Sequence, residues 1–183
     1  MKKTVFNEKI ELPEGITGSI KDNFLTLNGP ESRENNKDFN NPLIKLDVDG
    51  NKILLTTTKA TKREKKVLGT FKAHIKNMIR GVQKGHVYKL KICSSHFPMS
   101  VSINNNELIV KNFFGEKHPR VLKLKEGAET KLEGDLIVIK SPNKEIAGQI
   151  AGDIEQLTKI TNKDRRVFQD GIYIIEKDGK PIK

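Results

Sequence analysis

The sequence predicts an α+β protein made of two tandem duplicated domains, each an antiparallel β-sheet packed against one main helix. Three observations support this fold class. A strand-like segment recurs at a fixed offset, each copy is followed by an amphipathic helical pattern, and 183 residues suit two domains of about 90 residues as well as one larger domain. We place the first domain at residues 1–83 and the second at residues 84–183.

The repeat is clearest where "SIKDNFLTLNG" (19–29) aligns with "SINNNELIVKN" (102–112) at an offset of 83 residues. In both copies apolar residues alternate on either side of a turn-like pair, Asp22-Asn23 or Asn105-Asn106. This pattern is typical of a hairpin with one buried face. The same offset aligns Ile53-Leu54-Leu55 with Leu136-Ile137-Val138, which predicts a further strand in each copy.

Each copy then enters a helix. Thr61 with Glu64 three residues later forms a capping-box pattern at the start of the first helix, and Gly81 and Gly85 mark its end. The second helix is expected to begin with Ser141 as its N-cap and Pro142 at its first position. Here the offset falls to 79 residues, and the difference lies in the basic segment "TTTKATKREKK", where a loop can absorb an insertion.

The charge of the chain indicates a polyanionic partner. Lys and Arg total 34 against 23 Asp and Glu, a formal net charge of +11. Residues 1–90 carry 18 basic and 10 acidic side chains (+8), whereas residues 91–183 carry 16 and 13 (+3). The stretch 59–91 holds 11 basic residues and one acid, Glu64. A solvated helix face is the alternative reading of that stretch.

Catalytic and metal-binding patterns are missing from the sequence. Cys93 is the only cysteine, so neither a disulfide within the chain nor a cysteine-based metal site is expected, and a small buried apolar role suits it. The four histidines share no metal-ligand spacing, and "DVDGNK" (47–52) lacks the spacing of a calcium loop and predicts a β-turn. No nucleotide-binding or nucleophile motif is present. We therefore expect no cofactor, no metal and no enzymatic activity.

The sequence also lacks a secretory leader pattern and any apolar run close to the ~20 residues of a membrane span. We expect a cytoplasmic protein with no membrane partner.

Two segments are candidates for binding RNA. The first, "KNFFGEKHPR" (111–120), joins cations and a histidine to Phe113, Phe114 and Gly115, and a hairpin loop of this kind can enter an RNA groove. The alternative places both phenylalanine side chains in the core. The candidate residues of this loop are Lys111, Lys117, His118 and Arg120.

The second segment follows the last helix. A helix C-terminus favours one or two cations, but this one is followed by four, so we expect a phosphate-binding cluster. The apolar residues from Phe168 to Ile175 predict a strand that anchors it. The candidate residues are Lys159, Lys163, Arg165 and Arg166.

Three segments resemble the universal large-subunit ribosomal protein six family: "NMIRGVQKGHVYKLKICSSHFP" (77–98), "VKNFFGEKHPRV" (110–121) and "NKDRRVFQDGIYIIEKDG" (162–179). The last segment is similar to the archaeal and eukaryotic form, and the bacterial Gly-Pro-Tyr-Lys-Gly type of ending is absent. Because the long basic N-terminal extension common in eukaryotes is also missing, the chain looks archaeal.

The resemblance implies two duplicated α+β domains and a structural role in the large ribosomal subunit. It implies binding to large-subunit ribosomal RNA near the base of the lateral stalk and the sarcin-ricin region, beside neighbouring ribosomal proteins and without a small-molecule substrate. The family's RNA contacts lie mostly in the second domain. Matched to this chain, they fall on Lys117, His118, Arg120, Lys159, Lys163, Arg165 and Arg166.

Two other hypotheses remain open from the residues alone. One is an RNA-binding module that works outside the ribosome. The other is an RNA-processing enzyme that uses His118 or His86 with nearby lysines.

Overall fold

The computed structural model describes residues 6–30, 33–57, 61–164 and 166–182. The chain forms two compact units, Met1–Gly85 and His86–Lys183. The division expected after residue 83 falls in the last turn of the helix α1 (Lys62–Lys84). Within the described ranges, no helix is long and apolar enough to cross a membrane.

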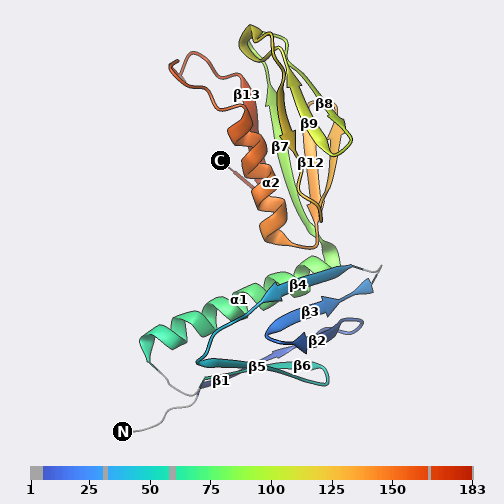
Figure 1. Ribbon diagram of the computed structural model, residues 1–183, viewed down its shortest axis with the longest axis vertical. Helices are drawn as coiled ribbons and strands as arrows, with labels where there is room; N and C mark the ends of the chain where they lie inside the picture. The colour runs from blue at the N-terminus through green and yellow to red at the C-terminus, as the bar shows by residue number, and fades with distance from the viewer. Residues whose placement is uncertain (1–5, 31–32, 58–60, 165, 183) are drawn as a thin grey trace. The chain divides into compact units, whose positions relative to one another are not determined.

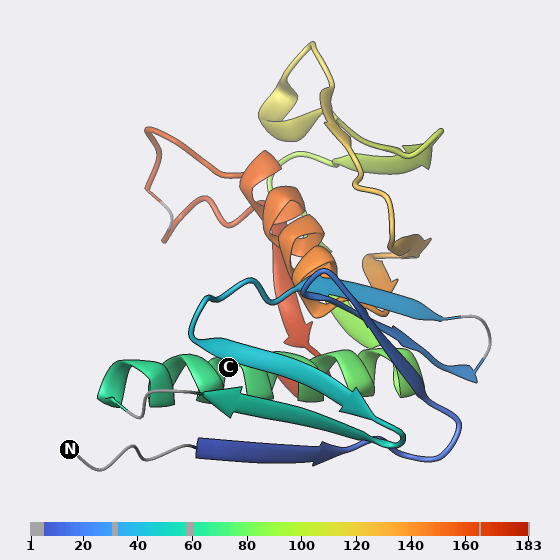
Figure 2. The ribbon, with the colours of Figure 1, turned by 60° about the horizontal axis from the view of Figure 1, so that its bottom comes forward.

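Unit 1 contains two three-stranded antiparallel sheets and α1 (Figures 1 and 2). One sheet has the order β1-β6-β5 and the other the order β2-β3-β4. The helix packs against strands of both sheets, and its apolar side closes a core that includes Leu27, Leu55 and Ile75, each 0% exposed. The strands are β1 (Phe6–Glu11), β2 (Thr17–Lys21), β3 (Phe24–Asn28), β4 (Glu34–Asp38), β5 (Ile44–Asp49) and β6 (Lys52–Thr57).

Unit 2 repeats this arrangement and extends it. The sheet β10-β9-β8 corresponds to β4-β3-β2, and β11-β12-β7 corresponds to β5-β6-β1, with β13 and β14 added beside β7. Both units are thus antiparallel sheets packed on one main helix, which confirms the predicted fold class. The elements are β7 (His86–Cys93), β8 (Ser100–Asn104), β9 (Glu107–Lys111), η2 (Phe113–Gly115), β10 (Arg120–Lys123), β11 (Glu129–Glu133), β12 (Leu136–Ser141), α2 (Lys144–Leu157), β13 (Gly171–Lys177) and β14 (Lys180–Pro181).

The two predicted hairpins are confirmed. Both turn residues have positive φ in each copy, 48° and 68° at Asp22 and Asn23, and 47° and 63° at Asn105 and Asn106. Two successive residues of this kind match the right-handed twist of the strands they join. The turn expected in "DVDGNK" is also confirmed, because β5 and β6 pair on either side of Gly50.

The alignment of Ile53-Leu54-Leu55 with Leu136-Ile137-Val138 is wrong by one residue. The strands β6 and β12 begin at Lys52 and Leu136, an offset of 84. The fully buried Ile53 and Leu55 therefore correspond to the fully buried Ile137 and Ile139. Because side chains alternate between the two faces of a strand, the offset of 83 would have matched side chains on opposite faces of the two strands.

The helix starts differ from the predicted caps. Thr61 is the N-cap of α1, but its side chain makes no capping hydrogen bond, so the capping box is not formed. The N-cap of α2 is Asn143, and its side chain accepts hydrogen bonds from the backbone N–H groups of Glu145 and Ile146. Ser141 instead ends β12, where its hydroxyl donates to the carbonyl of Gly127 over 2.6 Å and accepts from the backbone N–H of Asn143 over 3.0 Å, ahead of the first turn of the helix.

Gly85 caps the C-terminus of α1 with φ 74°, and Gly81 lies within the helix as its hydrogen-bond acceptor. Of the two glycines expected to end the helix, only Gly85 does so.

The predicted terminal strand is confirmed as β13. It pairs antiparallel with β7, on the edge opposite to β12, and Ile172 is 0% exposed in the core of unit 2. Its backbone is also tied to α2, because Ile172 N–H donates to the Thr158 hydroxyl over 2.9 Å and Ile174 N–H to the Glu155 carboxylate over 3.2 Å. The strand β13 is therefore held between α2 and β7.

Candidate nucleic-acid interface

Three connecting segments of unit 2 meet through their rings: residues 94–99 after β7, residues 112–119 after β9, and residues 158–170 after α2. Ring centroids lie 6.3 Å apart for Phe97 and Phe114, 4.8 Å for Phe113 and Phe114, and 5.8 Å for Phe114 and Phe168. We call Phe97, Phe113, Phe114 and Phe168 the aromatic cluster. It gathers side chains from positions as far apart in the chain as 97 and 168.

The backbone after β9 decides what the two adjacent phenylalanines do. Asn112, Phe114 and Gly115 have φ of 60°, 50° and 75°, and the Asn112 amide donates to the carbonyl of Pro98 over 2.9 Å. This twist sends the Phe113 ring into the core, where it is 2% exposed, and leaves Phe114 half-buried above it. Phe113 therefore lies in the core, as the alternative reading expects, whereas Phe114 is only half-buried and keeps ring surface in the loop.

Asp170 fastens the first of the three segments to the third. Its carboxylate is 2% exposed and accepts hydrogen bonds from the backbone N–H and hydroxyl of Ser95 and from the backbone N–H of His96. The His96 ring nitrogen Nδ1 lies 3.0 Å from Oδ2 of Asp170. Burial acts to raise the pKa of Asp170, but these hydrogen bonds together lower it below the usual range for aspartate.

The third segment is ordered by local contacts around Asp164. Its carbonyl accepts from the N–H groups of Val167 and Phe168, and its carboxylate accepts from the backbone and guanidinium of Arg166. The Arg166 hydrogen bonds lower the pKa of Asp164. The cation of Lys163 lies 4.8 Å from the ring centroid of Phe168 and 5.2 Å from that of Phe114, which are cation–π distances.

Arg120 connects the second segment to the end of α2. Its guanidinium lies 4.3 Å from the Phe113 ring centroid and donates to both carboxylate oxygens of Glu116 and to the carbonyl of Leu157, the latter over 2.7 Å. The hydrogen bonds from Arg120 lower the pKa of Glu116. A guanidinium held on three sides fixes the position of the loop.

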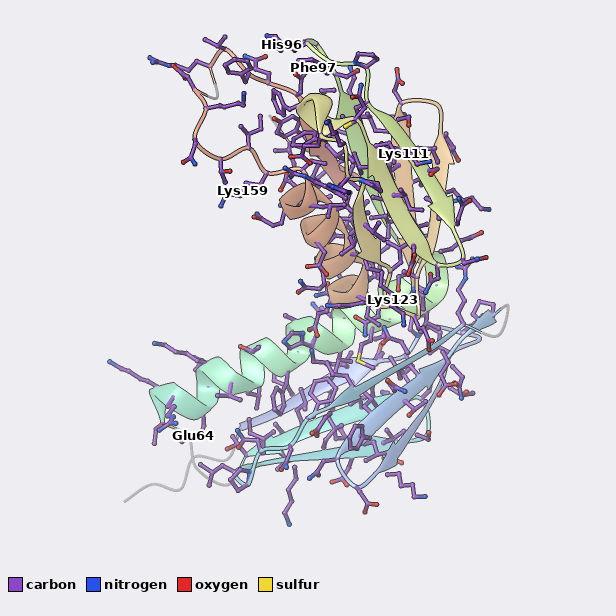
Figure 3. The ribbon with its side chains drawn as sticks, turned by 45° about the horizontal axis from the view of Figure 1, so that its top comes forward. Glu64, His96, Phe97, Lys111, Lys123 and Lys159 are labelled. Carbon is purple, nitrogen blue, oxygen red and sulfur yellow. The ribbon has the colours of Figure 1, made fainter. Side chains whose placement is uncertain are left out.

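The remaining predicted residues lie on the surface. Within the part of the chain that the structure describes, Lys111, Lys117, His118 and Lys159 are exposed and form no ion pair. The side chain of Arg166 is 90% exposed beside Asp164. Figure 3 shows Lys111 on the β9 side of unit 2 and Lys159 on the α2 side, so these two do not belong to one compact patch. Arg165 lies outside the described residues.

The structure thus joins Lys163 and Arg120 to the aromatic cluster, with Arg166 close to Lys163 in the same segment. It does not join all the predicted residues in one site.

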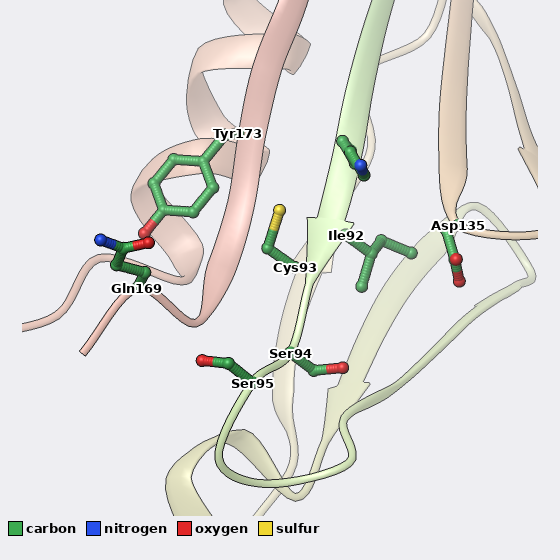
Figure 4. A pocket seen from close by; sticks show the side chains of 8 residues that line it. Ile92, Cys93, Ser94, Ser95, Asp135, Gln169 and Tyr173 are labelled. Atoms are coloured by element: carbon green, nitrogen blue, oxygen red, sulfur yellow. The ribbon is translucent and has the colours of Figure 1, made fainter. Parts of the chain in front are cut away.

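A groove of about 840 Å³ lies on unit 2 between the end of β7 and the start of β13 (Figure 4). Ser95 and Gln169 line it and belong to the first and third connecting segments. Among the described residues that line it, Lys91 is the one cation and Asp135 the one carboxylate. Cys93 lines it as well and is half-buried, whereas a small buried apolar group was expected there.

Ser95, Phe97 and Asp170 were not predicted as site residues, and His96 was considered only among the histidines that lack a metal-ligand spacing or a neighbouring nucleophile. Phe97 could have been noticed as a large apolar residue in the short polar segment that follows a strand. Asp170 gave no signal, because its partners lie 74 and 75 positions away.

His86, which the RNA-processing hypothesis used, lies inside unit 2. His86 is 0% exposed and its Nδ1 lies 2.9 Å from Asp178, so this ring is a buried structural group. Among the described residues, no group of His, Cys, Asp and Glu side chains could hold a metal ion.

Comparison with known proteins gives a match over both units. The family model described as "Ribosomal protein L6" matches residues 12–85 and 97–171. The chain is 44% identical over 190 aligned positions to the large ribosomal subunit protein uL6 of Nanoarchaeum equitans, covering 100% of this chain and 98% of the relative. It is 43% identical to uL6 of Methanobrevibacter smithii, over 93% of this chain and 96% of the relative. The identity to uL6 of Methanococcus vannielii is 38%, over 97% of each chain.

Proposed function

The chain belongs to the ribosomal protein L6 family, and on that premise we propose that unit 2 binds large-subunit ribosomal RNA near the base of the lateral stalk and the sarcin-ricin region. The protein is a structural constituent of the large subunit of the cytoplasmic ribosome and not an enzyme. The RNA-processing hypothesis is therefore wrong.

The observation that carries the proposal is a fixed aromatic cluster with cations at its margin. Recognition of RNA combines cations that neutralise phosphates with rings on which unpaired bases stack. Phe97 is 44% exposed and Phe114 is half-buried, so both present ring surface to a base. Because Asp170, Asp164 and Arg120 hold the three segments in place, little conformational entropy has to be lost on binding.

The proposed contacts have different roles. Lys163 stands beside the aromatic cluster, and Arg166 lies in the same segment with its side chain 90% exposed, so both would meet phosphates next to a stacked base. Arg120 is bound on three sides and acts chiefly by holding the loop against α2. The other exposed candidates would meet phosphates at a greater distance from the cluster; they are Lys111, Lys117, His118 and Lys159. Arg165 is included by its place in the sequence alone.

The neighbouring proteins of the stalk base are the proposed protein partners. An RNA-binding module outside the ribosome remains the alternative, and sedimentation of the tagged protein with large subunits separates the two. If the tagged protein is found only in ribosome-free fractions, the alternative is correct.

The test of the RNA site uses substitutions, because a truncated chain would lose β13 and with it part of the core. We expect the double variant Lys163→Gln with Arg166→Gln to bind a fragment carrying the sarcin-ricin and stalk-base helices less tightly. The plot of log affinity against log salt should become shallower by up to ~1.5 in slope, because each of the two lost phosphate contacts accounts for ~0.7 to 0.9.

The matched control replaces Lys123 and Lys177, which are exposed cations at the far ends of β10 and β13. It removes the same charge and should leave the footprint on the RNA unchanged. If both double variants reduce the slope equally, only net charge matters and the proposed site is wrong.

A further inference from the structure

The outward side of α1 carries only positive charge. The strands of unit 1 pack against the other side of the helix, as Figure 1 shows. Residues 62–84 contain a single acid, Glu64, which is 8% exposed and belongs to the buried side. The exposed cations form one group near the start of the helix and one near its end: Lys62, Lys65 and Lys66, and then Lys76, Arg80 and Lys84. We call the surface formed by these six residues and the exposed positions between them the cationic face of α1.

This charge is not required by the fold and works against the helix. The corresponding helix of unit 2, α2, holds one lysine and three acids. In α1, by contrast, Lys62 and Lys66 place like charges four residues apart, as do Lys76 and Arg80, and such pairs destabilise a helix. The cations near the start of α1 also oppose the helix dipole. Because a face that is merely solvated would mix both signs, the cationic face favours a polyanionic ligand.

Small residues separate the two groups of cations. Gly69 lies midway between Lys62 and Lys76, seven positions from each, and residues seven apart share one side of a helix. Ala73 follows one turn later, and both small residues are exposed. A Cβ added at Gly69 would have nothing within 4 Å. A ligand can therefore approach the helix backbone closely here, with a cation about 10 Å away along the axis in either direction.

The composition of the face indicates which polyanion it fits. Along residues 62–84, all of which the structure describes, no apolar side chain larger than alanine is exposed. An acidic protein would thus find none of the large apolar anchors that stabilise protein interfaces. An unpaired RNA strand would find no exposed ring to stack on, since Phe71 packs against Phe39 with ring centroids 5.0 Å apart. A double helix needs neither.

We propose that the cationic face of α1 binds double-stranded RNA and lies along its minor groove. In A-form RNA this groove is wide and shallow and displays 2′-hydroxyl groups, with a phosphate backbone on either side. The two groups of cations would each meet one backbone, while Gly69, Thr70 and Ala73 face the floor of the groove. The Thr70 hydroxyl donates to the carbonyl of Lys66 over 3.1 Å and keeps its lone pairs to accept from a 2′-hydroxyl.

This inference rests on the proposed function in taking RNA as the partner, and it adds a contact in unit 1 to the site in unit 2. The full-length protein, labelled with ¹⁵N, is titrated with a blunt RNA duplex of about 16 base pairs, which has no unpaired base for the aromatic cluster. We expect the amide signals of Gly69, Thr70 and Ala73 to shift. A DNA duplex of the same sequence should bind α1 more weakly, because its minor groove is narrow and lacks 2′-hydroxyl groups.

Two variants test charge and close approach separately, with the affinity read from the α1 amide signals. Lys66→Gln with Lys76→Gln should make the plot of log affinity against log salt shallower by up to ~1.8 in slope, at ~0.9 for each phosphate contact with a double helix. The matched control, Lys21→Gln with Lys45→Gln, removes two exposed lysines from β2 and β5 and should leave the slope unchanged. Ala73→Leu keeps every charge but blocks the close approach, so its affinity for the RNA duplex should fall to that for the DNA duplex. Far-UV circular dichroism checks that each variant is folded.

Shifts confined to the amides of unit 2 would show that α1 does not bind the duplex, and the proposal would be wrong. Equal affinities of the native chain for the RNA and DNA duplexes would mean that charge alone is recognised, which overturns the groove contact. Shifts of the α1 signals by a polyglutamate peptide, but not by the RNA duplex, would assign the face to an acidic protein and equally overturn it. None of these results bears on the salt dependence of the Lys163 and Arg166 variant, so the two proposals can fail separately.

Discussion

Replacing Asp170 by alanine should destabilise unit 2 and loosen the segment that carries His96 and Phe97. The carboxylate is 2% exposed and accepts from two backbone N–H groups, one hydroxyl and one imidazole nitrogen. A hydrogen bond to a charged group contributes about 1.5 to 3 kcal/mol, but these four share one carboxylate and their donors regain water in the exposed loop. Four independent bonds would contribute at least about 6 kcal/mol. We expect about half of that, a loss of about 3 kcal/mol in the free energy of unfolding.

The two tyrosines of the chain make the measurement selective. Tyr88 and Tyr173 both belong to unit 2, so tyrosine fluorescence follows the unfolding of that unit alone. A change of 1 kcal/mol shifts the melting temperature of a domain of this size by ~4 to 8 °C, so Asp170→Ala should lower it by roughly 12 to 24 °C. The surface variant Asp153→Asn is the control and should change the stability by less than about 0.5 kcal/mol.

The effect should also depend on pH in a defined direction. Because the hydrogen bonds outweigh burial and lower the pKa of Asp170, its contribution to stability is present above the unfolded-state pKa of about 3.9. That contribution is lost as the pH falls through the lower folded-state pKa. The difference between the native chain and Asp170→Asn should therefore be constant from about pH 5 to 7 and shrink below about pH 4. An Asp170→Ala chain that melts with the native one would refute the role of this carboxylate.

Two further predictions concern the helices. Asn143→Ala should lower the free energy of unfolding of unit 2, followed by tyrosine fluorescence, by about 1 kcal/mol, since Oδ1 accepts from two N–H groups at the start of α2. Amide exchange of Glu145 and Ile146 should become faster in Asn143→Ala but not in the control Ser141→Ala. Gly29→Ala should destabilise unit 1 by about 1 to 3 kcal/mol, because its Cβ would lie 1.9 Å from Cγ1 of the stiff Val82 side chain and 3.1 Å from the Val82 carbonyl. Thermal unfolding followed by circular dichroism at the helix band should show this loss, while unfolding followed by tyrosine fluorescence stays unchanged. A helix melting curve identical to that of the native chain would mean that α1 moves away from residue 29 at no cost.

The family resemblance and its large-subunit role were both predicted from three long segments of sequence, and both are confirmed by the match to the ribosomal protein L6 family. The site residues are different in kind. Lys163 and Arg166 were chosen for their charge, and the structure adds that Lys163 stands over two rings and that Arg166 is paired with Asp164. A sequence shows which side chains are charged, but it does not show which groups lie next to them in the folded chain.

The sequence alone determined the hairpins, the helices and the duplication, because each depends on a periodicity that spans only a few residues. Asp22-Asn23 and Asn105-Asn106 specify the same turn wherever they occur, and the apolar spacing of α1 and α2 is local as well. Such patterns do not show which of two neighbouring polar residues caps a helix: Asn143 caps α2, whereas Ser141 lies at the end of β12 and its hydroxyl bonds to Gly127 and Asn143.

Only the tertiary structure decided how the surface is assembled. Asp170 meets Ser95 across 75 positions, Arg120 meets Leu157 across 37, and the twist at Phe114 separates one buried ring from one half-buried ring. Glu64 likewise changed from a presumed helix cap to a buried carboxylate once the β5 side of unit 1 was packed against it. These contacts are set by which elements lie side by side after folding, and no local pattern encodes the partner that a side chain meets from a distant part of the chain.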